Sequence, residues 1–521
     1  MSKEHHIERH ILIGLITSTE FLDQIRPSWD HSLLKSTIVS RLAGWCIEYY
    51  DKYGKAPNKD IEGIYFQKLQ DGLEQDLAEE IEEDILPDLS DEYERDGFNV
   101  QYLLDRAREY LNRRHLETWS QRIRDLTDSG ETLEAEKLAN NFKPLSKDLD
   151  SSLNLSDPGS LDRVHKAFTT ALKPLVLYPG ALGEFMNAQL TRDALVAFMA
   201  PEKRGKSYIL LDLARRAVRQ RLNVAFFQAG DMSESQQIRR LGIHLLKKSD
   251  REEYCGKMWE PVRDCIHNQL DNCDLDIREC HQGLYGDKAP KNEKEAREEM
   301  TLDGLAELYK DPENKGYKPC HNCRKYQRKE NRWGCSWVKK VNVGQPLEPE
   351  EVVRTFENYF VRKKRRLMIS THPNNTLSVR QMRTILDIWY KQGFVPDVII
   401  IDYADLLTAD DVKEFRHKQD AIWKDMRSLS EERHCLVATA TQADAGSYEK
   451  NLLSLSNFSE DKRKYAHVTA MYGLNQDPRG REKAIGIMRI NELVIREGAN
   501  QGIVHVLQNL RRGQSVLTSY W

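Results

Sequence analysis

Residues 200–207, with the sequence APEKRGKS, carry the residue types that bind phosphate. They follow the apolar run ALVAFM and precede a stretch with helical periodicity. A glycine-bearing loop at the start of a helix offers backbone N–H groups and the positive end of the helix dipole to a phosphate. A lysine in such a loop reaches the terminal phosphates, and a hydroxyl binds Mg²⁺. The sequence therefore predicts a nucleotide-binding loop made of Ala200, Pro201, Glu202, Lys203, Arg204, Gly205, Lys206 and Ser207.

A second segment supplies the carboxylate that such a site needs. In VIIIDYADLL, four apolar residues end in Asp402. Ligands of open α/β sheets bind at the carboxyl ends of the parallel strands, so this side chain is expected beside the phosphate loop. There it would hold Mg²⁺, directly or through water. The alternative interpretation is an ordinary strand followed by an aspartate that caps a helix. The combination with Lys206 and Ser207 favours the magnesium site.

The elements that position these residues follow from the apolar pattern. Residues 1–145 have helical periodicity and predict a helical N-terminal domain, and residues 146–177 are rich in Ser and Asp and predict a linker. Residues 178–521 alternate short apolar runs with helical stretches, which is typical of a parallel sheet buried on both faces. The expected runs are ALVAFM, NVAFFQA, RLMIST, DVIIID and CLVATA, followed by AIGIMRI, GIVHVLQ and SVLTSYW.

Composition limits the classes of function. The formal net charge of −4 over 521 residues requires any nucleic-acid surface to be local. The charged start MSKEHHIERH lacks a signal-peptide core, and no apolar run approaches the ~20 residues of a membrane span, so we expect a cytoplasmic protein without a membrane partner. Seven of the nine cysteines lie within residues 250–345, a charged segment that interrupts the alternating pattern and reads as an insertion.

Taken together, these motifs resemble those of the DnaB-like replicative helicases, including members from phages, whose motor is a RecA-type ATPase. The stretch YPGALGEFMNAQLTRDALVAFMAPEKRGKS resembles that family's approach to its phosphate loop, which also often opens with alanine. The resemblance covers residues 178–521 without the insertion and, more loosely, the first 145 residues. It implies an α/β fold of RecA type, ATP and Mg²⁺ as cofactors, single-stranded DNA as the track, and a ring, expected to be a hexamer.

Three further residues take their roles from this resemblance. In VAFFQAGDM, Asp231 stands where the family has a catalytic glutamate; it is one methylene shorter, and its alternative role is to cap the following helix. In ATATQAD, Gln442 matches the glutamine that senses the γ-phosphate. In VIREGANQG, Arg496 matches the arginine finger that acts on a neighbouring subunit, although Val494 stands where the family has a basic residue.

The insertion predicts a structural zinc ion. KPCHNCRK places Cys320 and Cys323 two residues apart, a spacing that lets two thiolates bind one Zn²⁺ from a tight turn. Cys265 and Cys273, in DCIHNQLDNC, are the expected second pair. The possible substitutes are Cys280, His281, His321 and Cys335, and the alternative is a set of free thiols in a small apolar core. A segment this polar gains stability from a bound metal.

Basic clusters mark candidate DNA contacts. The DNA-facing loops of RecA-type rings follow the strand near Gln442, and in this stretch Lys462, Arg463 and Lys464 would follow the phosphate backbone. The sequence thus predicts an ATP-dependent DNA helicase that acts in replication. One alternative is a RecA-fold ATPase that binds or remodels nucleic acid without unwinding it. The other is a scaffold protein whose assembly is controlled by nucleotide binding. The helical N-terminal domain is the expected site for a primase or a loader.

Overall fold

A computed structural model of the protein describes residues 3–26, 29–72, 99–140, 173–325, 333–409, 415–457, 462–496 and 502–521, with residues 78, 81, 161, 164, 165 and 498 between these ranges. The chain divides into two compact units. The first comprises Met1–Ala171 with Asp387–Val395, and the second comprises Leu172–Leu386 with Pro396–Trp521. Most of the predicted linker, including 146–160, lies outside the described residues.

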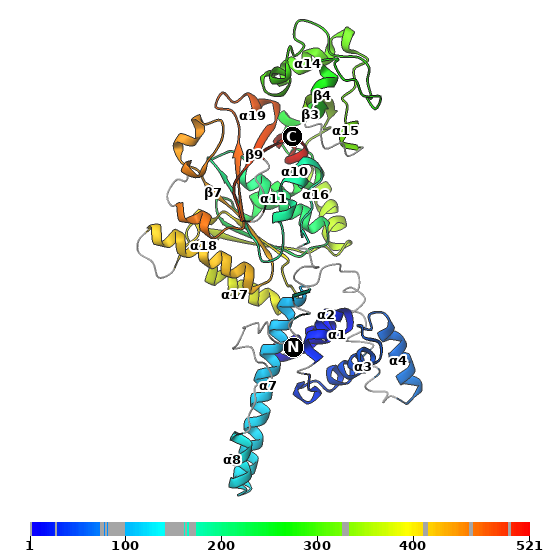
Figure 1. Ribbon diagram of the computed structural model, residues 1–521, viewed down its shortest axis with the longest axis vertical. Helices are drawn as coiled ribbons and strands as arrows, with labels where there is room; N and C mark the ends of the chain where they lie inside the picture. Colours follow the sequence, from blue (N-terminus) through cyan, green and yellow to red (C-terminus); the bar gives the residue numbers. More distant parts are fainter. Residues whose placement is uncertain are drawn as a thin grey trace. The chain divides into compact units, whose positions relative to one another are not determined.

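The first unit is helical. Apolar residues of its helices, such as Leu12 and Leu103, are buried in one core. Glu8 is buried with them, and its carboxylate accepts hydrogen bonds from the backbone N–H of Ser36 at 3.0 Å and from the hydroxyl of Tyr110. Figure 1 shows a long helix, α7, with α8 folded back along it. The helices are α1 (Lys3–Thr17), α2 (Thr19–Ile25), α3 (Thr37–Tyr53), α4 (Asp60–Gln70), α7 (Val100–Asp128) and α8 (Thr132–Asn140).

The second unit is built on a nine-stranded sheet with the order β11-β10-β9-β8-β1-β7-β6-β2-β5. The strands from β8 to β5 are parallel, and β9, β10 and β11 continue the sheet as antiparallel neighbours. All eight predicted runs form strands, whereas β8 had not been identified. The bounds are β1 (Leu195–Ala200), β2 (Val224–Gly230), β5 (Leu367–Pro373), β6 (Val398–Asp402), β7 (Leu436–Gln442), β8 (Ala470–Asn475), β9 (Ile487–Ile495), β10 (Ile503–Asn509) and β11 (Gln514–Tyr520).

Helices cover this sheet on both faces, which explains why its central strands are apolar throughout. Alternate side chains of β1, such as Phe198, join one core with α11, while the residues between them face the other side, where α18 packs against β1 and β7. These two helices are seen in Figure 1. The helices of this unit are α10 (Gly180–Met186), α11 (Lys206–Arg219), α12 (Glu234–Leu246), α16 (Pro349–Phe356), α18 (Phe415–Glu432) and α19 (Arg481–Ile485). A further helix, α17 (Val379–Tyr390), begins in this unit, and its residues from Asp387 belong to the first unit.

The cysteine-rich segment forms a separate substructure between α12 and α16. It contains an antiparallel pair of strands, β3 (Lys257–Cys265) and β4 (Gly334–Asn342). Between these strands in the sequence lie α13 (Ile266–Gln269), α14 (Leu302–Lys310) and α15 (Asn322–Lys325). A small core around Tyr317 and Trp337 holds it together. Its strands pack on the C-terminal hairpin, where Glu260 accepts hydrogen bonds from Asn509 at 3.1 Å and Arg512 at 2.5 Å. The insertion is therefore fixed to the end of the main sheet.

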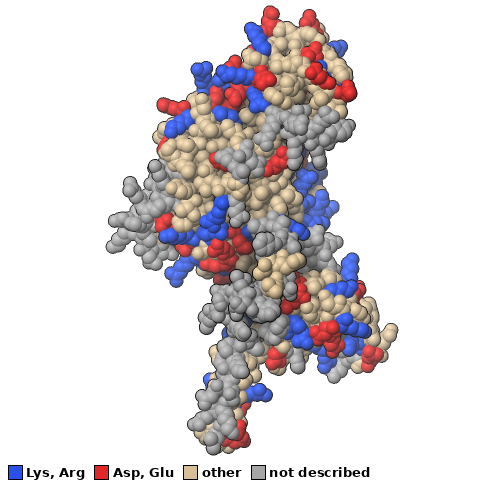
Figure 2. All heavy atoms as spheres, viewed as in Figure 1, with Lys and Arg blue, Asp and Glu red and all other residues tan. Residues whose placement is uncertain are grey.

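The surface carries both signs of charge. On the face drawn in Figure 2, Lys and Arg side chains lie among Asp and Glu side chains and form no single basic field. Within the described part of the chain, no helix has the length and apolar character needed to cross a bilayer.

Candidate nucleotide site

The phosphate loop turns sharply between β1 and α11, and its conformation depends on glycine. Gly205 has φ +87°, in the left-handed region that glycine adopts without strain, and Lys206 begins the helix. The loop lines a cavity of about 490 Å³ together with Asp231, Arg240, Tyr403 and other residues. A phosphate in this cavity would meet the N-terminal end of a 14-residue helix, as the sequence predicted.

Lys206 lies inside the loop. Its side chain is buried, and Nζ donates hydrogen bonds to the backbone oxygens of Ala200 at 3.0 Å and Pro201 at 3.1 Å. Burial lowers the pKa of Lys206, while nearby carboxylates, Asp405 first, act to raise it. The ammonium thus has only carbonyl partners among these bonds and sits beside the cavity. A polyphosphate would give this buried ammonium direct anionic acceptors in addition to the two carbonyl oxygens.

Asp402 and Ser207 meet as the sequence predicted. Ser207 Oγ donates to Asp402 Oδ1 at 3.1 Å, across 195 positions of the chain. Asp402 is fully buried at the end of β6, and burial raises the pKa of its carboxyl to about 6 against the hydrogen bond from Ser207. Its second oxygen, Oδ2, has no hydrogen-bond partner within the described residues. A hydroxyl, a carboxylate and this free buried oxygen suit Mg²⁺, which prefers hard oxygen ligands.

Asp231 lines the same cavity from the end of β2. It does not cap the next helix, because the N-cap of α12 is Ser233, whose hydroxyl and Gln236 form a complete capping box. The alternative interpretation of Asp231 is therefore wrong. The carboxylate is exposed and faces the space beside Lys206, from which it could orient a water molecule.

Gln442 lies at the end of β7, next to β1, and is not among the residues that line the cavity. Its Nε2 donates to the carboxylate of Glu202 at 3.1 Å, and its backbone N–H donates to Asp405 at 2.7 Å. Asp405 also accepts hydrogen bonds from Thr441 Oγ1 and pairs with Lys464 at 2.7 Å. The end of β7 is thus held by a buried polar cluster next to the phosphate loop.

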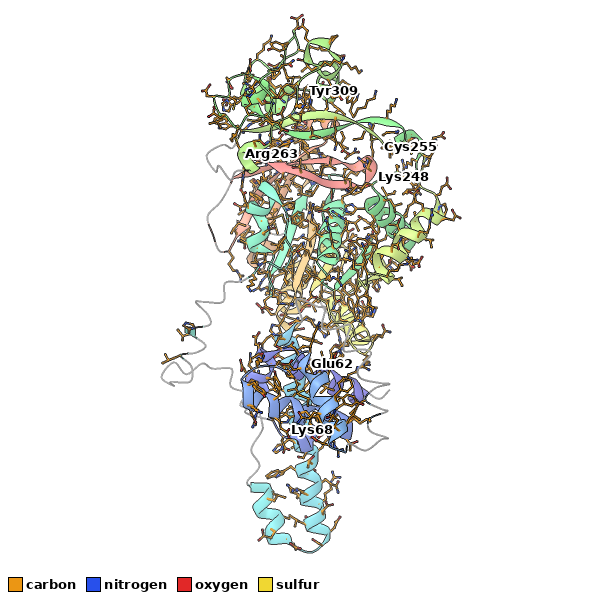
Figure 3. The ribbon with its side chains drawn as sticks, turned by 90° about the vertical axis from the view of Figure 1, so that its right-hand side faces the viewer. Glu62, Lys68, Lys248, Cys255, Arg263 and Tyr309 are labelled. Atoms are coloured by element: carbon orange, nitrogen blue, oxygen red, sulfur yellow. The ribbon has the colours of Figure 1, made fainter. Side chains whose placement is uncertain are left out.

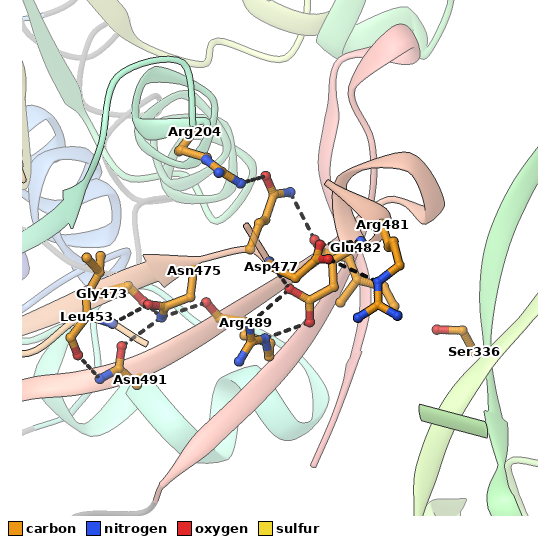
Figure 4. A network of polar contacts seen from close by, with 12 residues as sticks. Arg204, Ser336, Leu453, Gly473, Asn475, Asp477, Arg481, Glu482, Arg489 and Asn491 are labelled. Carbon is orange, nitrogen blue, oxygen red and sulfur yellow. Dashed lines mark hydrogen bonds and ion pairs between the residues drawn. The ribbon is translucent and has the colours of Figure 1, made fainter. Parts of the chain in front are cut away.

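The side chain of Arg204 is directed elsewhere. It donates to Gln476 at 3.1 Å, and its guanidinium lies 5.7 Å from the ring centre of Tyr448. Figure 4 shows how this contact joins the loop to the polar network after β8, in which Glu482 pairs with Arg489 at 2.6 Å. Arg204 therefore anchors the loop and is absent from the residues that line the cavity.

Sequence reasoning missed four residues of the cavity wall, Tyr208, Arg240, Tyr403 and Leu510. Arg240 and Tyr403 both line it, and Arg240 lies over the ring of Tyr208 at 5.1 Å. Tyr403 could have been suspected, because it follows Asp402 directly. Arg240 is nine residues beyond Asp231 on α12, and only the packing of that helix brings it to the site.

Arg496 lies outside this cavity. It is exposed just after β9, its backbone N–H donates to Thr469, and its guanidinium donates to the carbonyl of Ala466 at 3.4 Å. From this position Arg496 does not line the cavity.

The structure does not support the predicted zinc ion. Among the described residues, no group of three or more His, Cys, Asp or Glu side chains is placed to hold a metal, so Cys265, Cys273, Cys320 and Cys323 do not form the expected site. The backbone N–H groups of Cys265 and Cys320 instead converge on the buried carboxylate of Asp264, at 2.7 and 2.9 Å. Polar packing around this carboxylate organises the segment.

The remaining cysteines of the insertion have other surroundings. Cys335 is buried against Ile266 and Ala296, and Cys280 lies in the core around Trp337. Burial raises the pKa of Cys265 to about 11. These contacts match the alternative interpretation, thiols packed in small apolar cores.

The structure corrects one residue of the predicted DNA-facing cluster, which was Lys462, Arg463 and Lys464. Lys464 is only 1% exposed and is bound to Asp405, so its assignment to the DNA surface is wrong. The side chains of Lys462 and Arg463 lie outside the described part of the structure, as do residues 458–461.

No protein-family model and no curated protein matches the chain. Among solved structures, it is similar to one described as an ATPase domain, with 12% identity and a TM-score of 0.44, over 70% of this chain and 99% of that chain. It is also similar to a DnaB-like replicative helicase described with its interactions with primase, with 12% identity and a TM-score of 0.43, over 98% and 99%. The mixed sheet with a phosphate loop after β1 fits a RecA-type ATPase, and the chain resembles the DnaB-like replicative helicases.

Proposed function

We propose that the protein is an ATP-driven motor that translocates on single-stranded DNA as a ring, expected to be a hexamer, and unwinds duplex DNA during replication. The observation that carries the proposal is the hydrogen bond between Ser207 and Asp402 beside the buried ammonium of Lys206. Residues far apart in the sequence thus assemble the groups that phosphoryl transfer needs. The DNA-related part of the proposal depends on the motif resemblance to DnaB-like helicases.

Hydrolysis at this site would depend on position and charge. The loop and the N-terminus of α11 bind the phosphates, and Lys206 neutralises their charge. Ser207 and Asp402 would hold Mg²⁺, which supplies further charge neutralisation. Asp231 accepts a proton from, or orients, the attacking water. Gln442 is close enough to the loop to respond to the terminal phosphate through its contact with Glu202.

The ring explains the place of Arg496. Because its side chain is exposed and outside its own cavity, it would act on the site of a neighbouring subunit, as arginine fingers do. Turnover would then require assembly. The helical first unit would bind a primase or a loader, in line with the expectation from the sequence.

Two measurements on the full chain test the proposal: ATP turnover with and without single-stranded DNA, and strand displacement on a forked duplex. The proposed motor should give DNA-stimulated turnover and ATP-dependent displacement, and Lys206→Ala should lose both. Stimulated turnover without displacement would favour a nucleic-acid-dependent ATPase that does not unwind. Lack of stimulated turnover, with assembly that depends on nucleotide, would favour a scaffold.

A further inference from the structure

A second cavity opens from the phosphate site. It has a volume of about 560 Å³ and shares four residues with the first cavity: Tyr208, Asp231, Arg240 and Leu510. The two cavities are therefore continuous along one wall. Any ligand whose phosphates lie at Lys206 would have room for the rest of the molecule in this second space.

Beyond the four shared residues, most of the wall of the second cavity comes from three elements. One is α12, with Arg239, Arg240 and Ile243, and another is the short turn η13 (Leu510–Arg512) between β10 and β11. The third is the segment 249–254, at the start of the insertion, which adds Tyr254. Figure 3 labels Lys248 and Cys255, which bracket this segment at the base of the insertion.

These elements are bound to one another. The guanidinium of Arg512 donates to the carbonyl oxygen of Lys247 at 2.8 Å, and the side chain of Gln514 donates to the carbonyl oxygen of His244 at 2.9 Å. Gly513 has φ +66°, and a Cβ there would come within 3.1 Å of the His244 backbone. The turn, the end of α12 and the following segment therefore form a preorganised wall.

The chemistry of this wall is aromatic and cationic. Tyr254 is half-buried, with the guanidinium of Arg251 5.8 Å and that of Arg511 5.6 Å from its ring centre. Arg240 lies over Tyr208 in the same way. Tyrosine and guanidinium faces stack on flat heterocycles, and arginine also attracts phosphate. Ile243 and Leu510 add apolar surface.

We infer that this second cavity binds the base and ribose of the nucleoside triphosphate, and that the insertion completes it through Tyr254. The inference depends on the proposed phosphate site, because the phosphates at Lys206 determine which end of the ligand enters the second space. The insertion, which is not part of the general helicase pattern, then contributes directly to nucleotide affinity.

Two probes with Mg²⁺ separate the halves of the ligand: a non-hydrolysable ATP analogue and inorganic tripolyphosphate. Binding of each to the full-length protein is measured by calorimetry. In Tyr254→Ala, affinity for the analogue should fall about tenfold or more, because a stacking partner is lost, while affinity for tripolyphosphate stays within about twofold. Tyr254→Phe should bind both probes like the parent. Tyr309→Ala, which removes an exposed tyrosine on α14 of the same insertion (Figure 3), serves as the matched control.

The outcomes are distinguishable. Parental affinity of Tyr254→Ala for the ATP analogue would overturn the inference, and so would an equal loss for both probes, since that would indicate general damage to the site. If Tyr254→Ala does not fold, Arg511→Gln is tested in its place. It should lower the affinity for the ATP analogue and not that for tripolyphosphate. Equal affinity of Arg511→Gln and the parent for the ATP analogue would again overturn the inference. Lys206→Ala should lose both probes; if it retains tripolyphosphate, the proposed phosphate site fails instead.

Discussion

At the scale of single residues, Lys206 gives the most direct test of the phosphate loop. Its ammonium is buried against two carbonyl oxygens and is the compact charge nearest the expected phosphates. Lys206→Ala should reduce ATP turnover by a factor of ~10² or more while the fold is kept, because one preorganised charge is removed from the transition state. Steady-state turnover and circular dichroism measure the two properties. Lys257→Ala, at an exposed lysine of β3, is the control; parental turnover of Lys206→Ala would contradict the assignment.

His505 gives a test of stability that does not depend on function. Burial, with Arg297 and Arg489, lowers the pKa of this histidine to about 3, and its ring stacks on Tyr520 with an interplanar angle of 6°. A histidine kept neutral in the folded state contributes stability above its ordinary pKa of about 6.5, and this contribution is lost as the pH falls towards the folded value. Between about pH 7 and pH 5 the parent should therefore lose about 2 kcal/mol more than His505→Phe.

Denaturant unfolding of both proteins at the two pH values measures this difference. His281→Gln, at an exposed histidine of the insertion, should follow the parent. An equal loss of stability in the parent and in His505→Phe would show that His505 is not kept neutral.

Residue types alone were enough to predict part of the site. Lys206 and Ser207 could be identified because they close a glycine-bearing loop after an apolar strand, and Asp402 because it ends another; parallel strands end at the same edge of a sheet. Arg240 could not be identified in this way, because it lies far from the phosphate loop in the sequence and belongs to no motif that marks a nucleotide site. The burial of Lys464 could not be predicted either, since a lysine in a charged run gives no indication that it will be buried in an ion pair with a carboxylate of another element.

At the scale of elements, the pairing of Lys464 with Asp405 links three parts of the chain. Lys464 belongs to η12 (Lys462–Ala466), Asp405 to η9 (Ala404–Leu406), and the same carboxylate accepts the N–H of Gln442. Lys464→Met should therefore displace the end of β7 and lower kcat about tenfold or more, while affinity for an ATP analogue stays near the parental value. Lys450→Met, at an exposed lysine of the same segment, should leave both quantities unchanged.

A second variant keeps this prediction informative. Removing one partner of a buried ion pair costs about 3–5 kcal/mol, because the other charge stays uncompensated. The double variant Asp405→Asn with Lys464→Met removes both charges and should recover most of the lost stability. If kcat of Lys464→Met equals the parental value in a folded protein, Lys464 does not position Gln442.

The elements also explain why some predictions succeeded. Strands such as VIIID consist almost entirely of apolar residues, as a parallel sheet between two helical layers requires. The sequence therefore predicted that these segments form buried strands. The sequence predicted where the insertion interrupts the α/β pattern, but it did not predict the structure of the insertion. Its core depends on the buried carboxylate of Asp264, which gathers hydrogen bonds from Tyr317, Gln269 and the backbone of Cys320. No local sequence pattern predicts such a cluster of hydrogen bonds, and the cysteine spacing favoured a metal site instead.

At the scale of the whole molecule, Arg496 tests whether the protein works as an assembly. The exposed guanidinium lies outside its own cavity, so it can serve catalysis only by meeting the site of a second subunit. Arg496→Ala should keep the affinity for an ATP analogue and reduce turnover by about 10³ or more. Arg479→Ala, at an exposed arginine after β8, should behave like the parent.

Mixing two inactive variants makes this test specific for action between subunits. Arg496→Ala retains an intact phosphate loop, and Lys206→Ala retains an intact arginine, so an interface between one subunit of each kind can be complete. Exchange of subunits in the mixture should restore part of the ATP turnover, and the restored fraction should depend on the mixing ratio. Arg496→Ala that by itself retains parental DNA-stimulated turnover would contradict the role of this arginine. Failure of the mixture to recover any turnover, once exchange is demonstrated with labelled subunits, would instead place both residues in the same site or require coordination around the whole ring.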